Sequence, residues 1–309
     1  MTAPAIDVLI LTEERYRNPD PADWYQGQIA REEGLLAEAL AAQGLVAARR
    51  PWSDPTVDWR RCRSALFRST WDYFDRFAEF SSWLGRVSAC TRLFNPADLI
   101  RWNIDKRYLG ELGRQGVAIV PTRFVERGEA ATLAGVMDAC GWTEAVFKPV
   151  VSGAARLTHR VRRERLDAHE ALFARCVAAE AMMVQAFEPA ILDEGELSLV
   201  VIAGRTTHAV RKTPRAGDFR VQDDHGGSVH AHLPSVEECA FAEAAVAACP
   251  SAPVYARVDV VRGADGGLRL MELELVEPEL FFRFHPPAAQ ALATAITAAL
   301  GEDSRRATA

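Results

Sequence analysis

The 309-residue sequence lacks a positive charge excess, long apolar runs and paired cysteines, and each absence excludes a class of protein. The formal net charge is −6, whereas sequence-independent nucleic-acid binding needs a basic face that replaces counterions. No apolar run approaches the length of a membrane span, and residues 1–16 lack the basic region that begins a signal peptide. We therefore expect a cytoplasmic protein with no nucleic-acid and no membrane partner.

Several familiar motifs are also absent. The six cysteines include no C-x-x-C pair and the seven histidines no H-E-x-x-H, which is typical of reduced thiols and argues against a zinc site. Neither G-x-x-x-x-G-K-[ST] nor G-x-G-x-x-G occurs, so the two commonest phosphate-binding loops are excluded. The pair His230 and His232 is interpreted as part of an exposed polar strand.

The pattern of strands and helices predicts an α/β protein. Residues 6–11 form an apolar run of the kind buried on both faces, and residues 31–44 have helical periodicity that ends at Gly44. Strand–helix alternation over 1–98 indicates an N-terminal α/β domain with a parallel sheet. One long helix is expected over 98–116. Residues 99–187 and 188–309 then predict two α+β modules whose sheets are mostly antiparallel.

The segment from Tyr255 to Pro278, YARVDVVRGADGGLRLMELELVEP, predicts a hairpin with a two-residue turn at Asp265-Gly266. This register places Asp259 across from Glu272, and Arg257 across from Glu274. Residues two apart share a face of a strand, so three carboxylates converge beside one arginine, although like charges directly opposite one another destabilise a sheet.

Such a cluster must take up a proton or bind a cation, and hard oxygen donors suit Mg²⁺. The alternative is a solvated hairpin face on which Glu274 pairs with Arg257. We expect Leu268 and Leu270 on the same face as the carboxylates, which would bury them, and buried unpaired carboxylates are costly. The pattern therefore favours a metal.

Two lysines precede short polar or small-residue segments. A lone lysine on a helix, such as Lys106, is usually solvated, and Lys148 could simply end a strand. However, Lys148 is followed by VVSGAAR, in which Ser152 and Gly153 allow backbone N–H groups to approach a phosphate closely. Together with the acidic hairpin, this order indicates a nucleoside triphosphate site.

In residues 99–300 these motifs resemble the ATP-grasp ligases, whose fold combines a substrate-side α/β domain, a lid module and a metal-binding module. The resemblance implies these three parts at 1–98, 99–187 and 188–309. It also implies ATP and Mg²⁺, with two ions, as cofactors. NIDKRYL and VFKPVVSGAAR resemble the two ATP lysine motifs, MMVQAFEP the adenine-edging segment, and EGELSLVV the ribose-binding acid. The implied ATP residues are Lys106, Lys148, Ser152, Gly153, Gln185, Ala186, Phe187, Glu188, Glu196 and Lys212.

ARVDVV and MELEL resemble the metal-binding strands of the family, with Asp259, Glu272 and Glu274 as implied ligands. Many relatives have asparagine at the position of Glu274. The family chemistry implied is attack of a carboxylate on the γ-phosphate, followed by displacement of phosphate by an amine to give an amide. Arg257 and, through the GDFR loop, Arg220 would then act on the reacting groups.

The substrate pocket is predicted after the strand that ends near Phe67, at the edge of the parallel sheet where α/β ligands dock. The candidates are Arg68, Ser69, Thr70, Trp71, Asp72 and Tyr73, with Arg68 as a bidentate carboxylate clamp. The sequence is equally compatible with the alternative that Trp71 is a core aromatic residue and Arg68 a surface cation.

Resemblance to the glutathione-synthetase and ribosomal-modification branch, and within it to the D-cycloserine-forming type, implies activation and ring closure of O-ureido-D-serine. Such an enzyme would belong to antibiotic biosynthesis. The alternatives are a glutathione-synthetase-like ligase that joins an amino acid to a peptide or carrier amine, and a non-catalytic nucleotide-binding protein. The expected partner is a small amino-acid-like molecule. The sequence leaves the oligomeric state open, including a homodimer.

Overall fold

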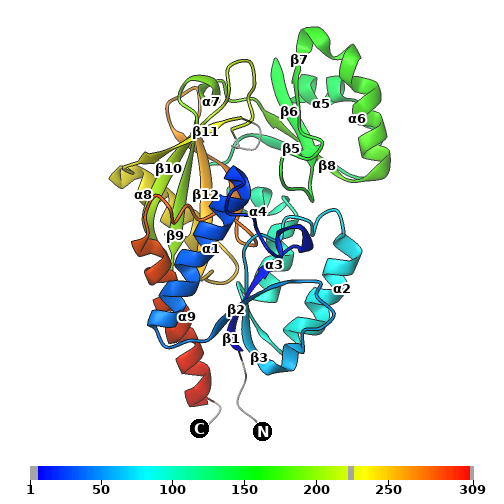
Figure 1. Cartoon of the computed structure of the whole chain (residues 1–309). Coiled ribbons are helices and arrows are strands. Elements are labelled where there is room, and N and C mark those ends of the chain that lie inside the picture. The colour runs from blue at the N-terminus through cyan, green and yellow to red at the C-terminus, as the bar shows by residue number, and fades with distance from the viewer. Residues whose placement is uncertain (1–5, 222–225, 307–309) are drawn as a thin grey trace.

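The computed structural model describes residues 6–221 and 226–306, which form three sheets (Figure 1). The first is parallel, with strand order β2-β1-β3-β4, as the sequence predicts. Its strands are β1 (Ile6–Thr12), β2 (Ala47–Pro51), β3 (Cys62–Phe67) and β4 (Arg92–Phe94), accompanied by α1 (Trp24–Ala42), α2 (Phe77–Ser88) and the short 3₁₀ turns η1 (Glu14–Tyr16) and η2 (Trp59–Arg61).

The first helix begins earlier than its periodicity indicates. Asp23 caps α1, since its carboxylate accepts the backbone N–H groups of Tyr25 and Gln26. Sequence periodicity alone placed the start near residue 31. Because α1 begins at Trp24, it includes Tyr25, which lines a cavity of the candidate active site.

The second sheet forms a separate module at the upper right of Figure 1, with antiparallel strand order β5-β8-β6-β7. Its strands are β5 (Thr122–Val125), β6 (Glu144–Pro149), β7 (His159–Arg162) and β8 (Met182–Ala186), and its helices are α5 (Leu133–Cys140), α6 (Asp167–Ala179) and the 3₁₀ turn η3 (Arg163–Arg165).

The third sheet is antiparallel, with strand order β11-β10-β9-β12-β13. Its strands are β9 (Glu196–Ile202), β10 (Arg205–Thr213), β11 (Ser228–His232), β12 (Tyr255–Arg262) and β13 (Leu268–Glu274), with α7 (Ala190–Asp193) and α8 (Val236–Ala247). The last helix, α9 (Pro287–Arg306), packs against α1 (Figure 1). One apolar cluster therefore joins the parallel sheet, the third sheet and α9, through residues such as Ile10, Val200 and Leu292.

Asn95 fixes the parallel sheet onto the third sheet. Its side-chain N–H group donates to the carbonyls of Tyr255 and Leu275 at 2.9 and 2.8 Å, and its oxygen accepts from the backbone of Val254 at 2.7 Å. All three partners flank the acidic hairpin. The hairpin is thereby held in a constant position relative to the N-terminal domain.

The expected single helix over 98–116 is wrong, because the structure contains α3 (Ala97–Ile104) and α4 (Tyr108–Arg114). Asp105 is extended, and its carboxylate accepts the N–H of Arg107. The N–H of Lys106 donates to the Val150 carbonyl at 2.9 Å, on the segment that follows β6, and so has no helical partner. This break places Lys106 between two sheets.

The acidic hairpin has the expected register at its carboxylates but not the expected turn. The loop contains three residues, Ala264 to Gly266, with Gly266 at a φ of +77°, and Gly263 bonds to Gly267 across it. A β-bulge at Met271 then shifts the register back by one. The two deviations cancel, so Asp259 faces Glu272 and Arg257 faces Glu274.

The bulge also reverses the faces of the outer residues. Leu268 and Leu270 pack with Val258 and Val260 on the face opposite the carboxylates, so their expected position was wrong. On the carboxylate face, Glu272 contacts Lys106 and Lys148 instead, and Asp259 and Glu274 contact Arg257. The alternation rule fails here because one extra residue changes the parity of the strand.

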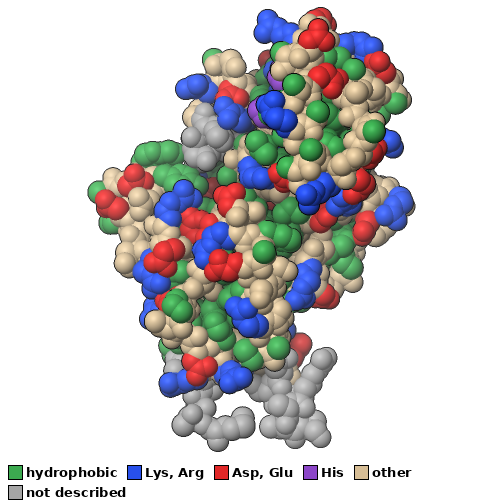
Figure 2. All heavy atoms as spheres, turned by 90° about the vertical axis from the view of Figure 1, so that its right-hand side faces the viewer, with side chains coloured by type: hydrophobic (Ala, Val, Ile, Leu, Met, Phe, Trp, Pro, Cys, Tyr) green, Lys and Arg blue, Asp and Glu red, His purple; other side chains and the backbone are tan. Residues whose placement is uncertain are grey.

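The exposed face in Figure 2 carries interspersed acidic and basic side chains and no broad patch of one sign. Within the described ranges, none of the helices combines the length and the apolar character that crossing a bilayer requires.

Candidate active site

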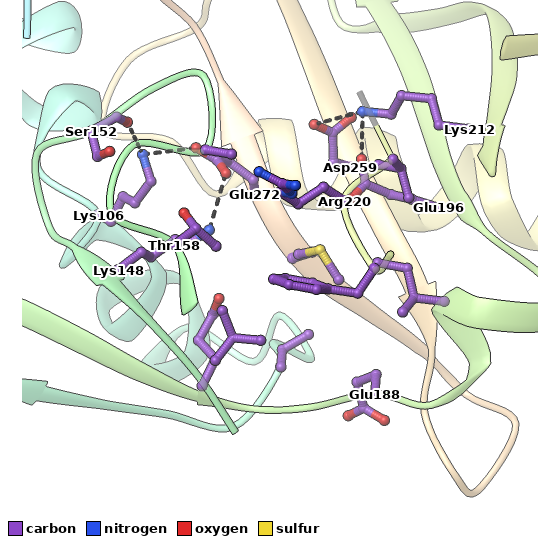
Figure 3. Close-up of a pocket in the computed structure, with 18 of the residues that line it drawn as sticks. Lys106, Lys148, Ser152, Thr158, Glu188, Glu196, Lys212, Arg220, Asp259 and Glu272 are labelled. Carbon is purple, nitrogen blue, oxygen red and sulfur yellow. Dashed lines mark hydrogen bonds and ion pairs between the residues drawn. The ribbon is translucent and has the colours of Figure 1, made fainter. Parts of the chain in front are cut away.

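One cavity between the second and third sheets is lined by all fifteen residues that the sequence assigned to ATP, metal or catalysis (Figure 3). We call it the nucleotide cavity. These residues come from segments far apart in the chain, between positions 106 and 274. They are Lys106, Lys148, Ser152, Gly153, Gln185, Ala186, Phe187, Glu188, Glu196, Lys212, Arg220, Arg257, Asp259, Glu272 and Glu274.

At one end of this cavity, Glu272 lies between two lysines. Its carboxylate oxygens are 2.8 Å from Nζ of Lys106 and 3.3 Å from Nζ of Lys148, and Lys106 also donates to the Ser152 carbonyl at 2.6 Å (Figure 3). Burial alone would raise the pKa of Glu272, but the two lysines outweigh burial and lower it. Glu272 is therefore ionised, and both lysines face a common anionic position.

A second ionic group lies farther along the cavity. Nζ of Lys212 is 2.5 Å from Glu196, its neighbour across β9 and β10, and 3.6 Å from Asp259. Asp259 accepts hydrogen bonds from Ser198 at 2.5 Å and from the guanidinium of Arg257 at 2.8 and 2.9 Å. Burial opposes ionisation of Asp259, but Arg257 and Lys212 outweigh it and lower its pKa.

Glu274 shares Arg257 with Asp259, since Nη2 of Arg257 also donates to the Glu274 carboxylate. Burial, with added repulsion from Asp259 and Glu272, raises the pKa of Glu274 to about 7. Of the three hairpin carboxylates, Glu274 is therefore the one most readily neutralised by a proton or stabilised by a cation.

The three carboxylates lie on one wall of the cavity, as the hairpin register predicts, but they do not form a ready-made metal cluster. Within residues 6–221 and 226–306, no group of three acidic, histidine or cysteine side chains is arranged to hold a metal. Each carboxylate is directed at a lysine or arginine instead. The donor set nevertheless fits Mg²⁺, because this ion keeps several waters and takes one or two carboxylates together with substrate phosphates. Asp259, Glu272 and Glu274 would supply those carboxylates from one cavity wall.

The other end of the nucleotide cavity is apolar, and most of its residues could not be predicted from the sequence. Val120, Ile191, Val221, Phe219 and Met271 belong to one cluster with Phe187. Apolar residues at strand ends look the same in a sequence whether they fill a core or line a slot. A flat apolar slot beside the backbone of residues 185–188 suits a planar base.

The small-residue loop between β6 and β7 has an unusual backbone. Ala154, Ala155 and Leu157 have φ values of 48°, 54° and 48°, in the left-handed region that non-glycine residues rarely adopt. A Cβ on Gly153 would lie 2.6 Å from the ring of Phe74, so the loop closes directly onto the N-terminal domain. Loop residues such as Ser152 and Thr158 line the nucleotide cavity beside Lys106 and Lys148 (Figure 3).

A second cavity, which we call the acyl cavity, adjoins the first. It shares Lys106, Lys212, Arg257, Glu272 and Glu274 with the nucleotide cavity. Its opposite wall comes from the N-terminal domain and from the segment after β13, and contains Tyr25, Trp71, Tyr73, Glu277, Glu279 and Phe281. Sequence reasoning placed Trp71 and Tyr73 in the substrate pocket but assigned no site role to Tyr25.

The other four predicted substrate residues lie elsewhere. Arg68 and Ser69 line a third, smaller cavity, the side hollow, which also contacts Tyr25, Trp71 and Glu279. Thr70 and Asp72 line none of these three cavities. The carboxylate of Asp72 accepts from Trp52 at 2.6 Å and from Arg76 at 2.7 Å, which is a structural arrangement.

Arg68 is not the surface cation of the alternative interpretation. It is 5% exposed, its Nη2 donates to the Pro278 carbonyl, and its guanidinium lies over the Tyr255 ring. Its role as a bidentate carboxylate clamp stays a prediction.

Comparison with known proteins agrees with this geometry. Residues 8–95 match the family model for the N-terminal domain of D-cycloserine synthetase DcsG. The chain is 34% identical over 280 residues to the cycloserine biosynthesis protein DcsG of Streptomyces lavendulae, covering 84% of this chain and 91% of that protein. The crystal structure of D-cycloserine synthetase DcsG matches with a TM-score of 0.82 and 32% identity, over 95% of this chain and 99% of that one.

D-alanine–D-alanine ligase from Bacillus anthracis shares the fold, with a TM-score of 0.69 at 14% identity over 98% of this chain and 99% of that one. These matches confirm the predicted fold class, with its parallel-sheet domain and two antiparallel modules.

Proposed function

The chain belongs to the ATP-grasp ligases and is an ATP-dependent carbon–nitrogen ligase, and from this premise we propose that it closes a small amino-acid-like substrate into a ring by way of an acyl phosphate. The candidate substrate is O-ureido-D-serine and the candidate product is D-cycloserine, since the relative at 34% identity is a cycloserine biosynthesis protein.

The observation that carries this proposal is the wall common to the two cavities. Lys106, Lys212, Arg257, Glu272 and Glu274 face both the nucleotide cavity and the acyl cavity. A triphosphate in the first and a carboxylate in the second would therefore meet at this wall. Proximity of this kind removes much of the entropic cost of a two-reactant step.

In the proposed complex, Lys106 and Lys148 hold phosphate oxygens as point charges, the backbone of residues 185–188 holds the adenine, and Glu196 the ribose. Ser152, Gly153 and Lys212 complete the phosphate site. Asp259, Glu272 and Glu274 hold two Mg²⁺ ions, which supply charge neutralisation of the triphosphate.

Arg257 lies where the acyl carbonyl would react. Its guanidinium spans Asp259 and Glu274, which fixes its orientation before substrate binds. In the proposed mechanism it donates to the developing oxyanion, and removal of such a donor commonly costs on the order of 10²–10³ in rate. Arg220, held by Asp218 at 2.7 Å, would approach the transferred phosphoryl group from the nucleotide side.

The proposal keeps the division into 1–98, 99–187 and 188–309, supported by the confinement of each sheet to one of these segments. It also keeps a cytoplasmic location, supported by six free cysteines. A homodimer is the remaining expectation, which analytical ultracentrifugation of the purified chain would check.

The decisive experiment measures phosphate release from Mg-ATP with O-ureido-D-serine alone and with small amino acids singly and in pairs, and identifies the product by mass spectrometry. Turnover with one carboxylate substrate, abolished by EDTA and restored by Mg²⁺, is the expected result. Turnover only with two substrates would favour the glutathione-synthetase-like alternative. Nucleotide binding without any turnover would leave the non-catalytic alternative.

A further inference from the structure

One carboxylate of the acyl cavity has no cationic partner in the described part of the chain. The other acidic side chains that line this cavity are each paired: Glu272 with Lys106, Glu274 with Arg257, and Glu279 with Arg283. Glu277 lines the same cavity, but no lysine, arginine or histidine among residues 6–221 and 226–306 forms an ion pair with it. The acyl cavity therefore contains an anionic position that these residues leave without a positive charge.

The N-terminal domain holds Glu277 in position. The indole Nε1 of Trp71 donates to the backbone carbonyl of Glu277 at 3.0 Å, and Nη2 of Arg68 donates to the next carbonyl, that of Pro278. The hydroxyl of Tyr73 is a hydrogen-bond donor to the Glu277 carboxylate. Three residues of the segment predicted to form the substrate pocket therefore fix the backbone and the side chain of Glu277.

The electrostatic surroundings of Glu277 show that its carboxylate faces the acyl cavity. Burial, with repulsion from Glu274, raises the pKa of Glu277 to about 8, although Lys106 and Tyr73 oppose this shift. All three of these neighbouring side chains line the acyl cavity. A cation beside Glu277 would favour its ionised form and offset the cost of burying its charge.

A primary ammonium group fits this position better than a metal ion. Glu277 lines the acyl cavity but not the nucleotide cavity, so it does not face the phosphates that Mg²⁺ accompanies. An ammonium group offers three N–H donors to a carboxylate, and its charge is favoured beside aromatic rings such as those of Tyr25 and Trp71 in the same cavity. In an α-amino acid this group lies only two bonds from the carboxyl carbon, so both ends belong in one cavity.

We propose that Glu277 binds the α-ammonium group of an amino-acid substrate whose reacting carboxylate lies at the wall shared by the two cavities. This inference rests on the proposed function, which places the carboxylate at that wall. The nitrogen that closes the ring belongs to the side chain of the substrate and is not engaged by this contact. Glu277 is then a specificity-determining residue that distinguishes amino acids from carboxylic acids without an amine.

The test compares two amino acids with their deamino counterparts: O-ureido-D-serine with 3-(ureidooxy)propanoic acid, and D-homoglutamine with adipamic acid. Calorimetry measures their binding to the wild-type chain and to Glu277→Gln, in the presence of the non-hydrolysable analogue AMPPNP and Mg²⁺. We expect the wild-type chain to bind each amino acid about 10- to 100-fold more tightly than its deamino counterpart. Glu277→Gln should reduce this ratio to about threefold or less by weakening the binding of the amino acid alone.

Glu111→Gln is the matched control for the loss of a carboxylate. Glu111 is also a partly buried glutamate held by an aromatic residue, since it accepts from the indole Nε1 of Trp102 at 2.6 Å. It lines none of the three cavities, so Glu111→Gln should keep the full preference for the amino acids. The melting temperature of Glu277→Gln should be unchanged or higher, because the substitution removes a buried charge that is costly in the absence of substrate.

Equal affinity of the wild-type chain for the amino and deamino compounds would overturn the proposal, as would an undiminished preference in Glu277→Gln. A lower kcat with that preference intact would make Glu277 a general base instead, and loss of Mg-AMPPNP binding would make it a metal ligand.

The proposal and the proposed function fail in different measurements, because calorimetry requires no turnover. A chain that prefers the amino acids through Glu277 but releases no phosphate would contradict the proposed function and leave the ammonium site intact. A chain that closes the ring but binds the deamino compounds as tightly would contradict the ammonium site alone. Absence of binding by both amino acids would overturn both.

Discussion

Replacement of Glu272 by glutamine should separate nucleotide binding from turnover. Glu272 is the anion that Lys106 and Lys148 share, at 2.8 and 3.3 Å, and it is also an implied Mg²⁺ ligand. Glutamine has nearly the same shape but no charge. Glu272→Gln therefore frees two lysines for phosphate while it removes a carboxylate from the metal site.

The expected magnitudes follow from burial. Breaking a buried ion pair by removal of one partner costs about 3–5 kcal/mol. The side chain of Glu272 is 23% exposed, which favours the lower value, about 3 kcal/mol, or a decrease in Tm of about 6 °C at this chain length. Turnover should fall by at least about 10²-fold. Metal-free ATP, which no longer competes with Glu272 for the lysines, should bind as tightly as before or up to about tenfold more tightly.

Three measurements check this: a thermal melt, calorimetric titration with ATP in EDTA, and phosphate release with Mg-ATP. Glu144→Gln is the control for loss of charge alone. The side chain of Glu144 is 20% exposed, lies 2.6 and 2.9 Å from Arg160 and Arg162, and does not line the cavity. It should lose comparable stability and keep full turnover.

Two results would refute the reasoning. If Glu272→Gln turns over at the wild-type rate, Glu272 does not serve the metal. If it loses metal-free ATP binding, the two lysines do not face the phosphates.

Three further outcomes follow from the contacts. Lys148 lines only the nucleotide cavity, whereas Lys106 lines both cavities. In steady-state kinetics, Lys148→Met should therefore raise the KM for ATP about tenfold and leave the KM for the carboxylate substrate unchanged, whereas Lys106→Met should change both KM values. Equal effects of the two variants would contradict the two-cavity arrangement. Asn95→Ala removes three buried hydrogen bonds and should lower the free energy of unfolding in urea by about 3 kcal/mol, and a loss below about 1 kcal/mol would show that the two sheets are held otherwise. Burial, with the nearby His285, lowers the pKa of His208 to about 4. Between about pH 6.5 and 4 this histidine is therefore protonated in the unfolded chain and neutral in the folded chain, so the free energy of unfolding should fall as the pH decreases through this range. His208→Gln should reduce this decrease by roughly 2–4 kcal/mol in urea titrations at the two pH values, and an unchanged slope would exclude His208 as its source.

Most of the candidate site could be predicted from the order of the motifs along the sequence. The lysines, the acidic strands and the segment 185–188 are recognisable because each charged or polar residue occurs beside a strand or small-residue loop with a definite direction. The hairpin register was predicted correctly at Asp259 and Glu272 through two errors that cancelled, a turn one residue too short and an unseen bulge at Met271. Neither feature has a sequence signal stronger than the Asp-Gly dipeptide itself.

What the sequence concealed depends on tertiary contacts. The break at Asp105 arises because the N–H of Lys106 donates to the Val150 carbonyl, on the segment after β6, and helical periodicity cannot reveal a partner so distant in the sequence. Tyr25 enters the acyl cavity only because α1 begins at Trp24. The apolar slot near Phe187 and the side hollow at Arg68 are cavities, and the shape of a cavity cannot be predicted from the types of the residues that line it.

The three-residue loop and the bulge at Met271, whose register shifts cancel, affect which insertions and deletions this hairpin can tolerate in evolution. The side chain of Asn103 bonds to the backbone of Leu273 and Leu275, and the hydroxyl of Tyr108 accepts from Leu273, so the acidic end of β13 is anchored independently of the tip. An insertion or deletion at residues 264–266 can therefore be absorbed at Met271 without turning Glu272 over. The length of the hairpin tip can therefore vary in evolution while the acidic end of β13 keeps its position.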